Sequence, residues 1–108
     1  MRDQREHFVV SSHAETRAKQ RHIDQSAFRE ASREALRSNL HDQLIEQQRK
    51  LQPMLTDKPI HAKVGPREYK ASNCEISTRL DLNGTTFVVG IRREGEGYTP
   101  LTVATAWN

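Results

Sequence analysis

The chain has few cysteines, few aromatic residues and no long apolar run. Because Cys74 is its one cysteine, no intramolecular disulfide can form, and a free thiol is typical of proteins from a reducing compartment. No apolar stretch approaches the roughly 18 residues of a membrane span, and the start MRDQREHFVV lacks the apolar region of a signal peptide. We therefore expect a cytoplasmic protein that does not enter a membrane.

Spacings that hold a metal or a nucleotide cofactor are also missing. The five histidines show neither zinc-finger nor H-E-x-x-H spacing, and the cysteine has no CxxC partner. No glycine-rich loop precedes an expected helix, so the phosphate cradle of ATP- and NAD-binding proteins is not indicated. The sequence predicts no metal and no cofactor. The histidines are His7, His13, His22, His41 and His61.

The composition is polar for a globular protein. Apolar residues make up 34% of the 108 residues, whereas globular domains usually reach roughly 45 to 50% with glycine included. The length predicts one domain over residues 1–108, with a thin core or with a partner that covers part of it. Lysine and arginine outnumber aspartate and glutamate by 17 to 14, which gives a net charge of +3. This mild excess favours an anionic partner.

The first half of the chain has the pattern of helices. The capping box at residues 12–15 predicts a short helix over residues 13–20, and Asp24 is a good N-cap for a second helix. Apolar residues then recur with a helical period as far as Leu51, where Pro53 should end the helix. One unbroken helix would measure roughly 40 Å. Either it projects, which could serve a homodimer, or it breaks near residues 38–39.

The second half has the pattern of strands. The runs CEISTRLDL and TTFVVGIRR flank Asn83-Gly84, a pair that predicts a two-residue hairpin and fixes the register, with Leu80 opposite Phe87. Further strands are expected at residues 8–10, 60–64 and 101–107. The expected fold is α+β, with a short and a long helix on one face of a three- to four-stranded antiparallel sheet. The other face should carry cationic side chains, namely His61, Lys63, Arg79 and Arg92.

His13, Arg17 and Arg21 are spaced four residues apart and would form one ridge on the short helix. The run HAETRAKQRHID that contains them resembles the pattern H-x-x-x-R-A-x-Q-R-x-I-D of the RelE-like superfamily of small ribonucleases, in particular the phage early endoribonucleases of the RegB type. The order of a short helix, a longer helix and a sheet with cations on its exposed face is also similar.

This resemblance implies metal-independent RNA cleavage, in which the ribose 2′-hydroxyl attacks the adjacent phosphate. Such chemistry needs proton transfer and cations around the phosphate, which suits His13 together with Arg17 and Arg21. The second catalytic histidine of the family corresponds to Arg33 here, so another imidazole would have to replace it. The implied catalytic residues are His13, Arg17, Arg21, His61 and Arg79; Lys63, Arg92 and Arg33 would bind substrate, and His41 is a further candidate imidazole.

Other functions fit the same residues. The ridge could be an ordinary solvated helix face, and the missing histidine fits a relative that binds RNA or DNA without cleaving it. A third hypothesis is a protein-binding effector that holds a host protein or an inhibitor through the long helix. The partners implied are RNA, including ribosome-associated mRNA, and an inhibitor protein of the kind that commonly accompanies toxins of this superfamily.

Overall fold

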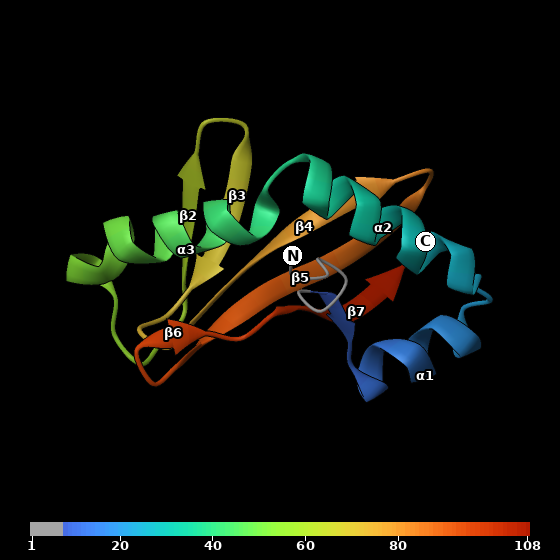
Figure 1. The fold of residues 1–108 in the computed structure, drawn as a ribbon, viewed down its shortest axis with the longest axis horizontal. Coiled ribbons are helices and arrows are strands. Elements are labelled where there is room, and N and C mark those ends of the chain that lie inside the picture. The colour runs from blue at the N-terminus through green and yellow to red at the C-terminus, as the bar shows by residue number, and fades with distance from the viewer. Residues whose placement is uncertain (1–7) are drawn as a thin grey trace, which may run out of the picture.

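The computed structural model describes residues 8–108, so His7 and the start of the chain lie outside the described part. Helices α1, α2 and α3 pack with a sheet of seven strands (Figure 1). The helices are α1 (Ser12–Gln20), α2 (Gln25–Arg37), α3 (Leu40–Leu51) and the short 3-10 helix η2 (Gln52–Met54). The strands are β1 (Phe8–Val10), β2 (Ile60–Val64), β3 (Arg67–Ala71), β4 (Glu75–Leu82), β5 (Thr85–Glu94), β6 (Gly97–Tyr98) and β7 (Leu101–Trp107).

The sheet is mixed, which corrects the predicted fold. Its strands run in the order β1-β7-β5-β4-β3-β2, with β6 paired to β5. The β1 strand is parallel to β7, and the other pairs are antiparallel. The structure is α+β, as predicted. The predicted arrangement of two helices on a three- to four-stranded antiparallel sheet was wrong. The prediction missed β3 because Gly65-Pro66 was interpreted as the end of a strand, and the segment REYKA that follows has three charged residues and no apolar run.

The expected long helix is broken, as one of the two alternatives predicted. Asn39 adopts a left-handed backbone conformation with φ of 51°, and this residue separates α2 from α3. Asparagine tolerates this conformation better than most residues. The amide of Gln43 reinforces the break because its Nε2 donates to the carbonyl of Ser38 at 2.6 Å. Both helices therefore lie against the sheet, and neither projects as a single long rod (Figure 1).

Side-chain caps determine where α1 and α2 begin. Asp24 caps α2 as predicted, because its carboxylate accepts from the backbone N–H of Ser26 at 3.1 Å. At α1 the cap is Ser11 and not Ser12, since the Ser11 hydroxyl accepts from the N–H of Ala14 at 3.1 Å. The Ser11 N–H also donates to the carbonyl of Val103. The start of α1 is thereby fixed beside the edge of β7.

The β4–β5 hairpin has the predicted turn and register. Asn83 and Gly84 both have positive φ, 51° and 83°, as a type I′ turn requires. Leu80 lies opposite Phe87, and Glu75 lies opposite Arg92, where the two charged groups approach to 3.7 Å. The turn is also tied to α2, because the Asn83 side chain donates to the carboxylate of Glu30 at 2.8 Å.

The core lies between the sheet and the layer of α2 and α3. Phe28 of α2 meets Phe87 of β5 edge to face, with 5.5 Å between the ring centroids. Leu40 and Leu44 of α3 are also fully buried. In Figure 1 the two helices lie in front of β3, β4 and β5, whereas α1 lies beside β7. The opposite face of β2–β5 is left without a covering helix from the described chain. No helix within residues 8–108 is long and apolar enough to cross a bilayer.

Candidate nucleic-acid interface

The uncovered face of the sheet forms a broad hollow of about 970 Å³. Because side chains alternate between the two faces of a strand, the residues that point into it come from every second position. His61 lies opposite Lys70 across β2 and β3, and Lys70 lies opposite Ser77 across β3 and β4. On β4 the next residue on this face is Arg79, which lies opposite Val88 of β5. Sheet geometry alone therefore gathers cations from three neighbouring strands.

The hollow is positively charged. Four Lys and Arg line it against two acids, which is a surplus of two out of the chain's net +3. None of the four cations forms an ion pair with any residue of the described part. The acid Asp81 accepts a hydrogen bond from the hydroxyl of Thr86, and Arg67 donates to the carbonyl of Arg79 at 3.5 Å. The cations are Lys63, Arg67, Lys70 and Arg79, and the acids are Glu68 and Asp81.

Trp107 closes the hollow at the β7 side. Its ring is half-buried, and the guanidinium carbon of Arg79 lies 5.5 Å from the ring centroid. Simple alternation from Leu101 and Val103 would have placed Trp107 in the core. A β-bulge at Ala104 shifts the register between β5 and β7, so that Ala106 is buried and Trp107 turns onto the open face. Trp107 was not among the predicted site residues because no local sequence pattern indicates this bulge.

The ridge of α1 is not part of this hollow, since no α1 residue lines it. His13 and Arg17 are exposed on the helix, and the Arg17 guanidinium donates to the side chain of Gln20 at 3.3 Å. Arg21 is partly buried, and its Nη1 donates to the carbonyl of Ala106 at 2.6 Å. The three residues that sequence spacing put on one ridge thus have different environments, and Arg21 joins the end of α1 to the last strand.

This contact gives Arg21 a structural role that can be measured. Replacing Arg21 with alanine should lower the free energy of unfolding by about 1 to 2 kcal/mol, because a charged donor to a partly buried carbonyl is lost. Urea denaturation checks this value, and Arg17→Ala is the matched control, since Arg17 lies one turn earlier and is exposed. An equal and small effect of the two substitutions would contradict the structural role.

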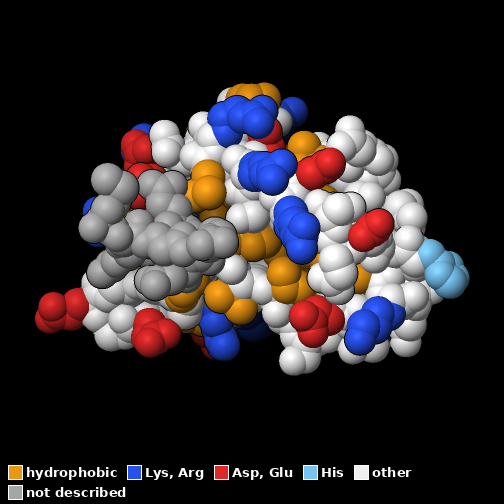
Figure 2. Space-filling view, turned by 45° about the vertical axis from the view of Figure 1, so that its right-hand side comes forward, with side chains coloured by type: hydrophobic (Ala, Val, Ile, Leu, Met, Phe, Trp, Pro, Cys, Tyr) orange, Lys and Arg blue, Asp and Glu red, His pale blue; other side chains and the backbone are white. Residues whose placement is uncertain are grey.

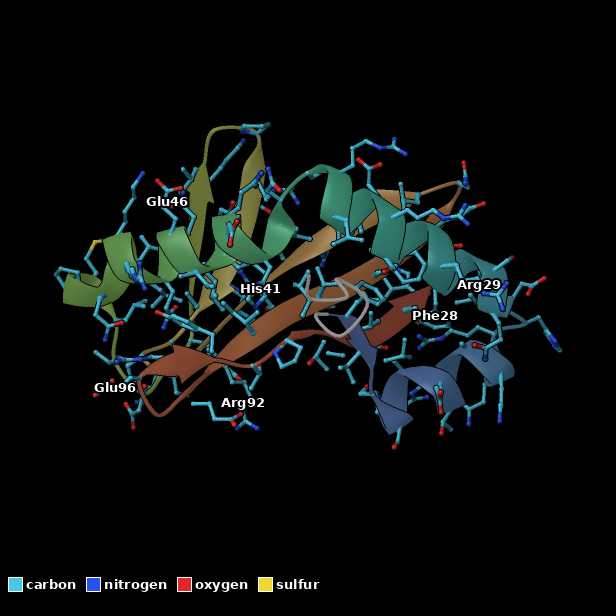
Figure 3. The ribbon with its side chains drawn as sticks, viewed as in Figure 1. Phe28, Arg29, His41, Glu46, Arg92 and Glu96 are labelled. Atoms are coloured by element: carbon cyan, nitrogen blue, oxygen red, sulfur yellow. The ribbon has the colours of Figure 1, made fainter. Side chains whose placement is uncertain are left out.

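The remaining predicted residues lie outside the hollow. Arg33 is exposed on α2, in the helix layer, where Arg29 and Arg37 lie four residues to either side of it. Figure 2, turned by 45° from the view of Figure 1, shows Lys and Arg side chains interspersed with Asp and Glu. Arg92, labelled in Figure 3, is on the same face of the sheet as Arg79 but lies near the end of β5, where it pairs with Glu75. His41 is on α3, and its Nε2 lies 2.9 Å from the carbonyl of Thr99.

The two imidazoles that could replace a second catalytic histidine are therefore on opposite sides of the sheet. His61 lines the hollow, whereas His41 belongs to the helix layer (Figure 3). Of the eight residues predicted for the site, the structure brings together His61, Lys63 and Arg79. Lys70, Arg67 and Trp107 join them. Lys70 and Arg67 were not predicted because both lie on β3, a strand that was not recognised in the sequence.

The described residues contain no cluster of three or more His, Cys, Asp or Glu side chains able to hold a metal ion. Cys74 is exposed, and its thiol lies 3.4 Å from the hydroxyl of Ser72, with which it shares the turn before β4. The hollow offers lysine and arginine side chains, one imidazole, one indole ring and the carboxylates of Glu68 and Asp81.

No known protein family, curated protein or solved structure matches this chain. The geometry of the hollow and the residues that line it are therefore the features that indicate a function.

Proposed function

We propose that this protein binds RNA across the uncovered face of its sheet, with the phosphate groups held by Lys63, Lys70 and Arg79. The observation that carries the proposal is a concave sheet face on which these cations gather without ion-pair partners among the described residues. Guanidinium and ammonium groups that are not neutralised locally are free to bind phosphate oxygens. The aromatic ring beside them is a further feature of surfaces that bind nucleic acid.

The strand arrangement supports an extended ligand. From β2 to β7 the face crosses four strand intervals, β2-β3-β4-β5-β7, which corresponds to roughly 19 Å at about 4.8 Å per interval. Cations are spread over the first three of these strands and are not concentrated at one point. Such a track suits several successive phosphates of a polymer better than a single small anion.

Removing two cations from this face should weaken RNA binding. The double variant Lys63→Ala with Lys70→Ala is expected to bind a short fluorescent RNA about tenfold more weakly at low salt, because two phosphate contacts and their released counterions are lost. Fluorescence anisotropy measures the change. Both lysines are exposed, so the fold should persist, which circular dichroism checks.

The matched control is the double variant Lys19→Ala with Arg29→Ala. It removes the same charge from exposed positions on α1 and α2 that do not line the hollow. Arg29 is labelled in Figure 3. Its affinity should stay within about twofold of the parent protein, since neither Lys19 nor Arg29 lines the hollow and neither would contact the bound phosphates. If both double variants lose affinity equally, binding depends on net charge and the proposed face is wrong.

RNA cleavage without a metal stays a second candidate, favoured by the position of His61. This imidazole lies opposite Lys70 on the same face as Arg79, so a proton acceptor and phosphate-binding cations share one surface. Incubating RNA with the protein in EDTA tests it, with His61→Ala and His13→Ala assayed side by side. Loss of products in the His61 variant alone would place the chemistry in the hollow, whereas loss in the His13 variant alone would place it on α1.

The protein-binding hypothesis had two motives, the low apolar content and a helix longer than the domain needs. The second is lost because the long helix is broken and α2 and α3 both pack on the sheet. Binding of RNA fits the cytoplasmic location expected from the free thiol. An inhibitor protein that competes with RNA would cover the same cationic face.

A further inference from the structure

The chain's single tryptophan lies on the face where we propose that RNA binds. Trp107 is the last residue of β7 and lies opposite Thr86 of β5, and its ring forms part of the wall of the hollow. Tryptophan is highly buried on average, yet this ring is only partly buried. It also forms no hydrogen bond with any residue in the part of the chain described. A fixed apolar ring is thus presented to solvent beside unpaired cations.

Two features place the ring here, and the residue opposite it in the sheet is small. The bulge at Ala104 turns Trp107 out of the core while the adjacent Ala106 is fully buried. The guanidinium of Arg79 lies 5.5 Å from the ring centroid, within the range of a cation–π contact. The neighbouring side chain across the sheet, Thr86, is small and is itself engaged with Asp81. The ring therefore has a defined orientation before any ligand arrives, which lowers the entropic cost of stacking.

We propose that Trp107 is a stacking platform for an unpaired nucleobase, so that the ligand of this face is single-stranded and not duplex. The inference rests on the proposed function and names its substrate class. Every base has a π face that can stack on an aromatic ring, but in a duplex both faces are already stacked within the helix. Lysines on β2 and β3 hold the phosphates, and the indole on β7 holds a base at the other side of the hollow.

Because the chain has one tryptophan, its own fluorescence reports on this contact. Titration with an unstructured oligoribonucleotide of about eight nucleotides should quench the emission in a saturable way, as expected for a base stacked on the indole. The same strand annealed to its complement, and inorganic polyphosphate of matched charge, should cause little quenching. Duplex or polyphosphate that quenches as strongly as the single strand would overturn the inference.

Variants of Trp107 separate stacking from charge. Trp107→Leu should weaken binding of a labelled single strand about tenfold, measured by anisotropy, because base stacking is lost, and should leave the affinity for polyphosphate unchanged. Trp107→Phe keeps an aromatic face and should recover part of the lost affinity, which also guards against a folding defect in the leucine variant.

The outcomes distinguish the inference from the function on which it rests. Equal binding of single strand and duplex, with no effect of Trp107→Leu, would reject stacking while leaving phosphate binding by the lysines intact. Failure of single strand, duplex and polyphosphate alike to bind at low salt would reject the proposed function itself.

Discussion

Raising the salt concentration from about 50 to about 200 mM is expected to weaken single-stranded RNA binding by about fifty-fold. The four Lys and Arg of the hollow would release counterions from about four phosphates, and the logarithm of the affinity then falls with the logarithm of salt with a slope of about −2.8. Anisotropy titrations at four salt concentrations give this slope directly. The cations concerned are Lys63, Arg67, Lys70 and Arg79.

The slope of affinity against salt also shows which side chains contact phosphates. In the Lys63→Ala, Lys70→Ala variant about two phosphate contacts remain, so the same change in salt should cost only about sevenfold. Trp107→Leu should lower the affinity at every salt concentration while the slope stays the same, since an indole releases no counterions. A parent protein whose affinity is insensitive to salt would contradict binding through phosphates.

Replacing Phe87 with alanine should lower the free energy of unfolding by about 3 to 5 kcal/mol, a large part of the roughly 5 to 15 kcal/mol typical of a whole domain. The Phe87 side chain is fully buried on β5 and meets Phe28 of α2 edge to face. Removing it leaves a cavity between the sheet and the helix layer, and an aromatic pair is lost as well. Guanidinium denaturation followed by circular dichroism measures the loss.

The next residue along β5 provides the control. Val88 is on the opposite face, half-buried in the hollow, so Val88→Ala should cost about 1 kcal/mol or less. If Phe87→Ala does not fold at all, Phe87→Leu should still fold with a smaller loss, because most of the buried volume is kept. Similar effects at positions 87 and 88 would mean that the two faces of β5 are not distinguished as core and surface.

Local chemistry explains which parts of the fold were predictable. Asn83-Gly84 determines the hairpin because few residue pairs adopt positive φ at two successive positions, and the register across β4 and β5 then follows. Asp24 could be recognised as a cap for a similar reason, since its short carboxylate reaches a backbone N–H. Asn39 could only be offered as one alternative, because asparagine inside a helix pattern does not always break it.

Long-range pairing explains most of what was missed. The parallel contact of Phe8–Val10 with β7 joins residues more than 90 positions apart, and no local pattern encodes such a partner. The charged strand β3 was overlooked because Gly65-Pro66 was interpreted as the end of a strand, whereas these residues connect two paired strands. The missing strand also hid the contributions of Lys70 and Arg67 to the cationic face.

The candidate site was predictable in part for a geometric reason. Alternation along strands correctly put His61, Lys63 and Arg79 on one face, because β2 and β4 pair with their neighbours without a bulge and the period of two holds along them. The spacing of His13, Arg17 and Arg21 gives a shared helix face in the same way, but it cannot tell where that helix packs. The position of α1 depends on contacts such as the one between Arg21 and Ala106, which sequence spacing does not reveal.

The pairing of β1 with β7 has a consequence for the nascent chain. Until residues 101–107 have been synthesised, β5 has one open edge, and both β1 and α1 lack the strand against which they dock. A chain interrupted before this point would present unpaired backbone groups next to apolar side chains, a surface on which other chains can add as strands. Whether the nascent chain folds or aggregates should therefore depend on the synthesis of its last strand more than on the formation of its helices.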